Sequence, residues 1–272
     1  MPTISKITVQ KKQKYRYNIF LKENDKEYYA FSVDEDLLIS YHLRKGMELT
    51  KGLIDQIQEK DASYKVYTLS IRFLSYRMRS EQELIEYLQK KDIEITYIKE
   101  VVQRLKRESL LDDLAFSEAF VRTRIQTTSK GPILVRKELK DKGVEAAIID
   151  RALELYTYDK QFEKTKRLIE KKMTNSSKKS FKQQLNAVKQ NILQKGFTLE
   201  LIHDVLQEID LGEDAEAEYQ AVVYQGQKIQ TKYQKKDTGY KLKQKVKAAL
   251  YRKGFDGESI QRFIDEYMEE DL

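Results

Sequence analysis

A pattern of about 50 residues recurs four times along the chain, and it limits the possible folds more than any other feature of the sequence. Each copy centres on a pivot residue, and the pivots Asp92, Gly143, Gly196 and Gly254 lie 51, 53 and 58 residues apart. A large apolar residue stands four positions before each pivot, an apolar residue follows it, and an isoleucine lies six positions after it. These flanking residues are Leu88, Ile93 and Ile98; Leu139, Val144 and Ile149; Ile192, Phe197 and Ile202; Leu250, Phe255 and Ile260.

The spacing predicts that one helix ends at each pivot and that another begins just after it. Glycine adopts the left-handed conformation past a helix end without a Cβ clash, and Asp92 tolerates that conformation better than most residues do. A third helix is predicted upstream of each pair, in residues 63–78, 113–125, 159–173 and 214–234. Tandem units of this kind meet mainly their neighbours and form elongated, curved bodies.

The first 60 residues differ from the rest. The stretches "ITVQ", "YRYNIFLK" and "YYAFSV" are rich in β-formers, and "DEDLLISYHLRKG" predicts a short helix, with "MELT" as a further short strand. The predicted fold is mainly α, with tandem three-helix, helix-turn-helix-like modules in an elongated curved array behind a small β-rich N-terminal domain. The predicted boundaries are 1–60 for the β-rich domain and 61–110, 111–157, 158–211 and 212–272 for the four modules.

The sequence offers little for catalysis or for metal binding. It has no cysteine and only two histidines, His42 and His203, which we expect to be structural or surface residues. It contains no phosphate-binding, dinucleotide-binding or hydrolase motif. Asp112 and Asp113 stand where a helix begins, which favours capping over metal binding. We therefore predict no catalytic residues, no metal and no cofactor.

The N-terminus lacks the apolar core of a signal peptide, and no apolar run approaches the roughly 20 residues that a membrane span needs. We expect a soluble, cytoplasmic, monomeric protein. Its net charge of +7 is unevenly distributed. Residues 160–182 carry nine Lys and Arg against two acids, and residues 228–253 carry ten against one. Such blocks favour a polyanionic partner, although charge runs are often simply solvated helix faces.

Two segments place basic side chains at predicted helix junctions. In "YRMRSEQEL", Ser80 and Glu83 have the spacing of a capping box, so Arg77 and Arg79 directly precede a helix. The segment "FVRTRIQTTSKGPILVRKEL" repeats this arrangement around Gly131 and its following proline. Such side chains can bind phosphate or carboxylate groups, or they can simply be surface residues near helix ends. The candidate partner- or DNA-binding residues are Arg77, Arg79, Arg122, Arg124, Lys130, Arg136, Lys137, Lys235, Lys236, Lys241, Lys243, Lys245 and Lys247.

Three motifs in this order resemble the RecX family, the bacterial regulators of the RecA recombinase. They are Arg77-x-Arg79-Ser80-x-x-Glu83-Leu84; Leu111-Asp112-Asp113-x-x-Phe116; and Gly131 followed by Leu139 and Gly143. The best match covers about residues 65–155, and the last two units resemble further copies of the family's third module. The β-rich start and the fourth unit resemble the longer Gram-positive-type members. Asp92 departs from the glycine that is common at its position.

The resemblance implies a non-enzymatic protein that lies in the groove of RecA filaments and mostly inhibits ATP hydrolysis and strand exchange. It also implies that single- or double-stranded DNA is a further possible partner. On this basis we expect that reversing Arg122 and Arg124 to glutamate weakens regulation without unfolding the protein. The alternatives are a sequence-nonspecific DNA-binding protein, a plain helical scaffold and, last, a hydrolytic or transferase enzyme. No helix shows the clustered Arg, Asn and Gln of a base-reading face.

Overall fold

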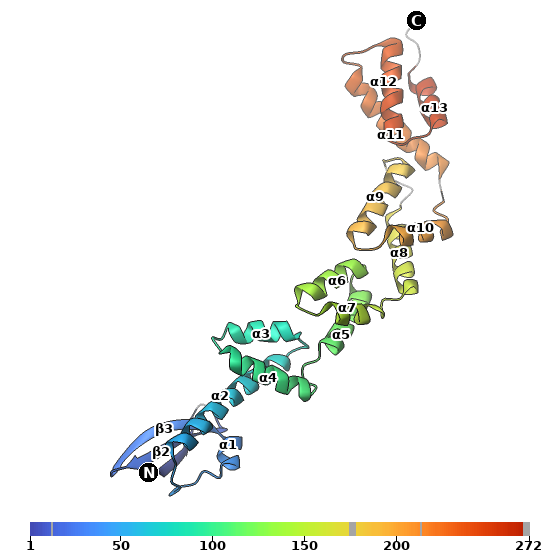
Figure 1. Cartoon of the computed structure of the whole chain (residues 1–272). Coiled ribbons are helices and arrows are strands. Elements are labelled where there is room, and N and C mark those ends of the chain that lie inside the picture. The colour runs from blue at the N-terminus through green and yellow to red at the C-terminus, as the bar shows by residue number, and fades with distance from the viewer. Residues whose placement is uncertain (12, 174–177, 213, 269–272) are drawn as a thin grey trace. The chain divides into compact units, whose positions relative to one another are not determined.

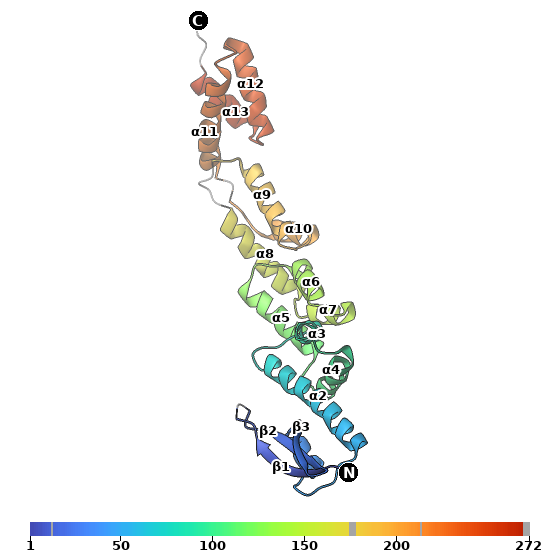
Figure 2. The same ribbon diagram turned by 90° about the vertical axis from the view of Figure 1, so that its left-hand side faces the viewer.

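The computed structural model describes residues 1–11, 13–173, 178–212 and 214–268, which form one small sheet followed by helices (Figures 1 and 2). Two compact units divide the chain: Met1–Ser117 with Lys140–Ile148, and Glu118–Leu139 with Ile149–Leu272. The predicted mainly helical fold with a β-rich start is confirmed. The module boundaries stay predictions. No helix in the described ranges is long and apolar enough to span a membrane.

The N-terminal sheet is an antiparallel meander of β1 (Thr3–Val9), β2 (Arg16–Glu23) and β3 (Lys26–Asp34). Asn24 and Asp25 form the two-residue turn between β2 and β3, and both have positive φ, as such tight hairpins require. The sheet packs against α1 (Glu35–Ser40) and the start of α2 (Lys51–Leu74). The core of this region is made by Ile4, Ile19, Leu21, Phe31, Val33, Leu43, Leu49 and Ile57.

The strand predicted at "MELT" is wrong. Within it only Glu48 pairs, through a single bridge to Thr3. Thr50 caps α2 immediately afterwards and accepts a hydrogen bond from the Leu53 N–H, so the chain turns into a helix before a ladder can form. The short helix α1 also ends at Ser40, before Gly46, the glycine that closes the segment predicted to be helical.

Helix α2 is longer than predicted because it joins the sheet to the first helical unit. It begins at Lys51 rather than at residue 63 and runs through the boundary predicted at residue 60. The buried Asp61 carboxylate accepts from both terminal nitrogens of Arg16 on β2, at 3.1 and 2.7 Å, and from the Asp34 N–H on β3. Burial opposes ionisation of Asp61, yet the bonds from Arg16 and Lys65 hold its pKa below the ordinary value.

The rest of the chain consists of helices. They are α3 (Glu81–Gln89), α4 (Ile95–Arg107), α5 (Asp113–Thr127), α6 (Pro132–Asp141), α7 (Ala146–Leu153), α8 (Tyr158–Lys172), α9 (Phe181–Gln194), α10 (Leu199–Glu208), α11 (Ala215–Tyr233), α12 (Gly239–Arg252) and α13 (Gly257–Tyr267). Mutual contacts group α2 with α3 and α4, α8 with α9 and α10, and α11 with α12 and α13.

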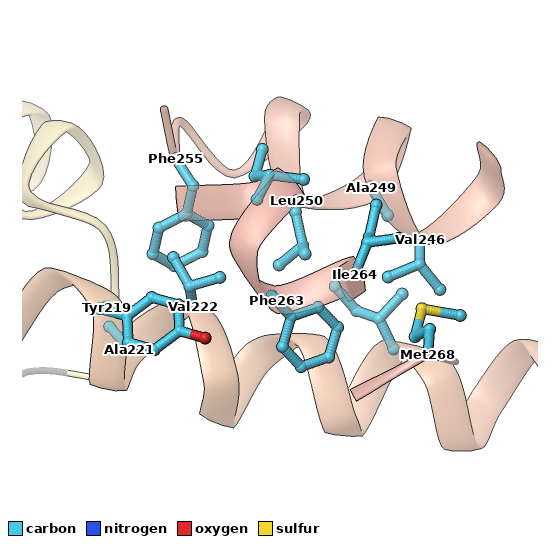
Figure 3. Close-up of a cluster of buried hydrophobic side chains, with 12 residues drawn as sticks. Tyr219, Ala221, Val222, Val246, Ala249, Leu250, Phe255, Phe263, Ile264 and Met268 are labelled. Atoms are coloured by element: carbon cyan, nitrogen blue, oxygen red, sulfur yellow. The ribbon is translucent and has the colours of Figure 1, made fainter. Parts of the chain in front are cut away.

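The predicted pivots are confirmed as helix-ending turns. Asp92, Gly143, Gly196 and Gly254 all have positive φ, at 56, 75, 86 and 84°. Their predicted flanking residues are buried almost throughout, and the residues four before and six after each pivot are at most 2% exposed. Figure 3 shows the result in α11–α13, where Leu250, Phe255 and Phe263 point into one core. A Cβ on Gly226 would lie 2.4 Å from the Phe263 ring, so α11 needs glycine there.

The glycine pivots also make a repeated contact with the start of another helix. The carbonyl before each glycine accepts a hydrogen bond at that start: Lys142 from Ser80 Oγ, Lys195 from the Gly131 N–H, and Lys253 from Ser180 Oγ. These acceptors lie at the N-terminal ends of α3, α6 and α9. The donor is the hydroxyl of the N-cap serine at α3 and α9, and a backbone N–H at α6.

The contact leaves little space for side chains. A Cβ on Gly143 would lie 2.4 Å from the Gln82 Cβ, and one on Gly196 would lie 2.7 Å from the Leu134 nitrogen. Gly131 is equally constrained, because its Cβ would lie 2.4 Å from the Gly196 oxygen. The fourth pivot, Asp92, carries a Cβ and therefore could not replace the glycine in such a close contact. The close approach, added to the backbone conformation, therefore explains the glycine at pivots 143 and 196. At Gly254 the nearest atom would lie 3.2 Å from a Cβ, so the positive φ is the stronger reason there.

Candidate partner-binding surfaces

The segment from Tyr76 to Arg79, here called the 76–79 turn, joins α2 to α3. The capping box predicted after it is confirmed: Ser80 Oγ accepts from the Glu83 N–H, and the Glu83 carboxylate accepts from the Ser80 N–H. Arg77 donates to Glu83 at 3.1 Å and is half-exposed. The turn also exposes Tyr76 and Met78, at 73% and 51% of their surfaces.

Arg79 is oriented by an aromatic ring rather than by a carboxylate. Its guanidinium lies 4.3 Å from the centre of the Phe73 ring, and Phe73 stacks on Tyr87 with 4.0 Å between ring centres. Its Nε is buried without a hydrogen-bond partner, and it forms no ion pair with any residue that the structure describes. Burial and the neighbouring Arg77 charge lower the pKa of the guanidinium. A planar cation pre-oriented by stacking is suited to binding a carboxylate or a phosphate.

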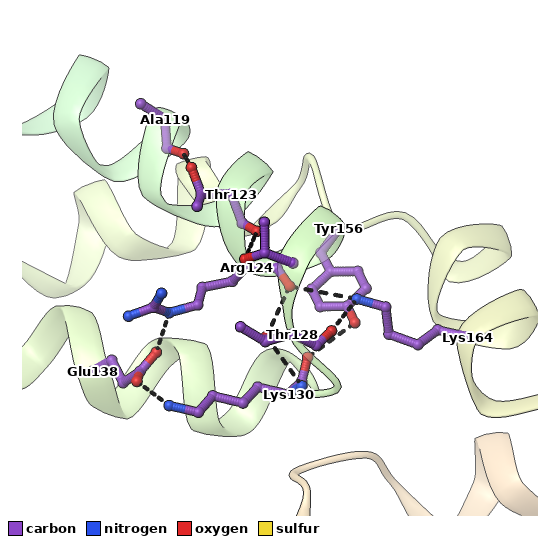
Figure 4. Close-up of polar contacts among 9 residues, drawn as sticks. Ala119, Thr123, Arg124, Thr128, Lys130, Glu138, Tyr156 and Lys164 are labelled. Atoms are coloured by element: carbon purple, nitrogen blue, oxygen red, sulfur yellow. Dashed lines mark hydrogen bonds and ion pairs between the residues drawn. The ribbon is translucent and has the colours of Figure 1, made fainter. Parts of the chain in front are cut away.

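Most candidate residues of the 122–138 segment form ion pairs within the protein, and Figure 4 shows two of these pairs at Glu138. Arg124 Nε donates to Glu138 at 2.8 Å, and Lys130 donates to the other oxygen of the same carboxylate. Burial opposes the ionisation of Glu138, but Lys130 and Arg124 hold its pKa below the ordinary value. The Arg124 guanidinium also lies 4.3 Å from the Phe120 ring centre. Arg124 therefore joins α5 to α6, and Lys130 joins the loop before α6 to the same carboxylate.

The other residues of this group differ in how free they are. Arg122 pairs with Glu118 one helical turn away, at 2.8 Å, and Arg136 pairs with Asp150 at 2.5 Å. Lys137 is exposed and forms no ion pair within the described chain. We therefore expect Arg122→Glu to leave the protein folded. Arg124→Glu is less suitable for this test, because a glutamate at position 124 would face Glu138.

Among the candidate lysines between residues 235 and 247, some have partners within the protein and others do not. Lys241 and Lys245 both pair with Asp237, whose side chain is only 3% exposed, and Lys247 donates to Gln261. The remaining lysines of this group form no ion pair with described residues; they are Lys235, Lys236 and Lys243. The hydrogen bond from Lys245, together with Lys241, lowers the pKa of Asp237.

A basic row on α8 lies outside the predicted residue set. Lys160, Lys164, Arg167 and Lys171 stand at i, i+4, i+7 and i+11, the spacing that puts side chains on one helical face. They line a groove of about 440 Å³ beside the end of α5. The charge of residues 160–182 already indicates a basic region. The helical spacing of these four residues could also have identified the row from the sequence.

The residues considered for chemistry have structural or surface positions. Asp112 caps α5, where it accepts from the Leu114 and Ala115 N–H groups, whereas Asp113 accepts from the Glu81 N–H at the start of α3. His203 is exposed and bonds only with Gln207 among the described residues. The described ranges contain no cluster of three or more His, Cys, Asp or Glu residues that could hold a metal ion.

Comparisons with known proteins match most of the chain. Models described as the regulatory protein RecX N-terminal domain and the RecX first, second and third three-helix domains match residues 2–50, 67–105, 112–153 and 216–264. Regulatory protein RecX of Oceanobacillus iheyensis is 47% identical over 272 residues, covering 100% of both chains. The RecX protein of Halalkalibacterium halodurans is 41% identical over 266 residues, 98% of this chain and 100% of that one. A crystal structure of regulatory protein RecX covers 76% of this chain and 100% of its own, with 34% identity and a TM-score of 0.66.

Proposed function

Because this chain belongs to the RecX family of regulatory proteins, we propose that it binds filaments of the RecA recombinase and inhibits their ATP hydrolysis and strand exchange during recombination and DNA repair. The family name and the full-length similarity support a regulatory role. A partner of this kind requires a protein-binding surface rather than a catalytic pocket. The candidates are therefore the exposed parts of the predicted basic residues.

The proposal rests on the side chains that the 76–79 turn exposes and orients. Interfaces between proteins are enriched in Tyr, Met and Arg, and a few such residues provide most of the binding energy. Tyr76 and Met78 are exposed, and Arg79 is already oriented by the Phe73–Tyr87 stack. An arginine that is held in place before binding loses less conformational entropy when the partner arrives. We infer that this turn anchors the chain to an acidic surface of the filament.

The first experiment is to measure ATP hydrolysis by RecA on single-stranded DNA, with this protein added well below the RecA concentration. The assay is then repeated with excess bare single-stranded DNA. We expect inhibition that survives the excess DNA, because the protein acts on the filament. An unchanged hydrolysis rate in the first assay would contradict the proposal.

The second candidate function is sequence-nonspecific DNA binding, which the two basic blocks favour. In that case the protein would compete with RecA for DNA, and excess bare DNA would relieve the inhibition. Salt provides an independent discrimination, because binding that depends on phosphate contacts weakens steeply as salt rises. Binding to the filament should weaken less, since the exposed Tyr76 and Met78 contribute apolar contacts.

A further inference from the structure

A cavity of about 440 Å³ opens beside the start of α3, within the first compact unit. Its walls are the first turns of α3 and α5, the end of α4 with the chain after it, and the segment from Gly143 to Ile148. Part of the wall is apolar and is formed by Ile85, Leu111, Leu114 and Ile148. The cavity is therefore a concave surface on which the aliphatic part of a partner's side chain can pack.

Carboxylates dominate the charge of this cavity, although the whole chain is basic. Glu81, Asp112, Asp113 and Glu145 line it, and Lys106 is the one basic residue among the described residues of its wall. Lys106 already pairs with Glu81, at 2.7 Å. Four carboxylates and one ammonium give the lining a net charge of −3, in a chain whose net charge is +7. The cavity therefore attracts a basic group and repels phosphate.

Three of these carboxylates keep oxygens that no described residue binds. Asp112 Oδ1 accepts from two N–H groups in the first turn of α5, and Asp113 Oδ1 accepts from the Glu81 N–H. Their Oδ2 atoms and the exposed Glu145 carboxylate form no hydrogen bond or ion pair within the described chain. Burial, together with the Glu81 and Asp112 charges, raises the pKa of Asp113. A cation in the cavity would offset this repulsion and use the remaining oxygens.

The cavity adjoins the 76–79 turn. Arg79 ends the turn and Glu81 lines the cavity, so their Cα atoms lie within about 7 Å of each other. Arg79 meets no carboxylate within the described chain, so a cation and an acidic cavity, both available to a partner, stand next to each other. DNA carries only negative charge and cannot match both. A folded protein can present an acidic and a basic side chain at this spacing.

We propose that this cavity binds a basic side chain of the recombinase, beside the acidic group that meets Arg79. The aliphatic stem of that side chain packs on the apolar wall, and its charged head binds the unused oxygens of Asp112, Asp113 and Glu145. The inference rests on the proposed function, because it names the chemistry of the partner at the same surface. Adjacent charges of both signs fix the register of the complex, which a single basic patch does not.

The test is to measure binding of the fluorescently labelled full chain to RecA filaments on single-stranded DNA, and to the same DNA without recombinase. Asp112→Asn/Glu145→Gln neutralises the cavity, and the asparagine can still cap α5. The control Asp55→Asn/Glu59→Gln makes the same substitutions at exposed residues of α2, outside the cavity. We expect the cavity variant to bind filaments at least about tenfold more weakly, and the control to stay within about threefold of the wild type.

Binding to bare DNA separates a specific contact from a general effect of charge. Removing two negative charges increases the attraction to phosphate, so the cavity variant should bind bare DNA as tightly as the wild type or more tightly. Glu145→Lys, which places a cation at an exposed position of the cavity wall, should weaken filament binding more than Glu145→Gln does. Neither change at position 145 removes a contact that the described chain makes, and circular dichroism checks folding.

The outcomes distinguish this inference from the proposed function. A cavity variant that binds filaments as well as the control would overturn the inference and leave the proposed function standing. Equal losses of affinity for filaments and for bare DNA would do the same, because the effect would then not depend on the recombinase. Wild-type protein that does not bind filaments would overturn both.

Discussion

In the 76–79 turn the Arg79 guanidinium stacks on Phe73 and meets no carboxylate within the described chain, whereas in the 122–138 segment Arg124 and Lys130 share the Glu138 carboxylate. Both regions contain the same Arg-x-Arg pattern, just before α3 in the first and within α5 in the second, and in the sequence they are equivalent candidates. The difference teaches that a basic side chain is available to a partner only if the fold leaves it without an internal partner. The first region is suited to binding, and much of the second stabilises the protein.

The largest expected effect is on stability, and it tests the second region. Replacing Arg124 by Glu should lower the free energy of unfolding by about 2 kcal/mol, because a carboxylate would face Glu138 in a partly buried site. Lys137→Glu, at an exposed and unpaired position nearby, should change it by less than about 0.5 kcal/mol. Urea unfolding followed by circular dichroism measures both values. Equal effects of the two substitutions would remove the distinction between paired and unpaired residues.

The next effect concerns regulation and tests the first region. Arg79→Gln should raise the protein concentration needed for half-inhibition of RecA by about tenfold, as expected for an anchor residue at an interface. Arg77→Gln, the same substitution two residues earlier, should have a smaller effect because Glu83 already pairs with Arg77.

Both variants should have free energies of unfolding within about 1 kcal/mol of the wild type. Arg77→Gln loses only a surface ion pair, and Arg79→Gln loses only one cation–π contact. A larger loss of regulation in Arg77→Gln than in Arg79→Gln would show that internal pairing does not decide which arginine binds.

The smallest effect is a pH dependence in the second region. The pKa of Glu138 is lowered in the folded protein, so its contribution to stability is complete above the ordinary pKa of 4.5 and is lost as the pH falls through the folded value. Glu138→Gln should therefore be less stable than the wild type at pH 7, by about 1 kcal/mol or less. The difference should shrink between about pH 5 and pH 3 in urea unfolding at each pH. A constant difference across this range would assign the effect to packing rather than to charge.

Local signals in the sequence predicted much of the fold correctly. The pivots, the capping box at Ser80 and Glu83, and the buried residues around each turn depend on conformational preferences and spacing within a few residues. The long α2 was harder to predict, because Asp61 is held by Arg16 from a strand 45 residues away in the sequence. A contact between residues this far apart in the sequence fixes α2 against the sheet, and no local sequence pattern indicates it.

The sequence by itself determined the family, the helical repeats and the left-handed turns, because these follow from residue type and short-range spacing. Only the tertiary structure decided which basic residues are free, since Arg124 meets its carboxylate on the next helix and Lys164 meets carbonyls at the end of α5. It also explained why Gly196 must be glycine whereas Asp92 need not be. Both turns have positive φ, but only Gly196 has the Leu134 backbone where a Cβ would stand.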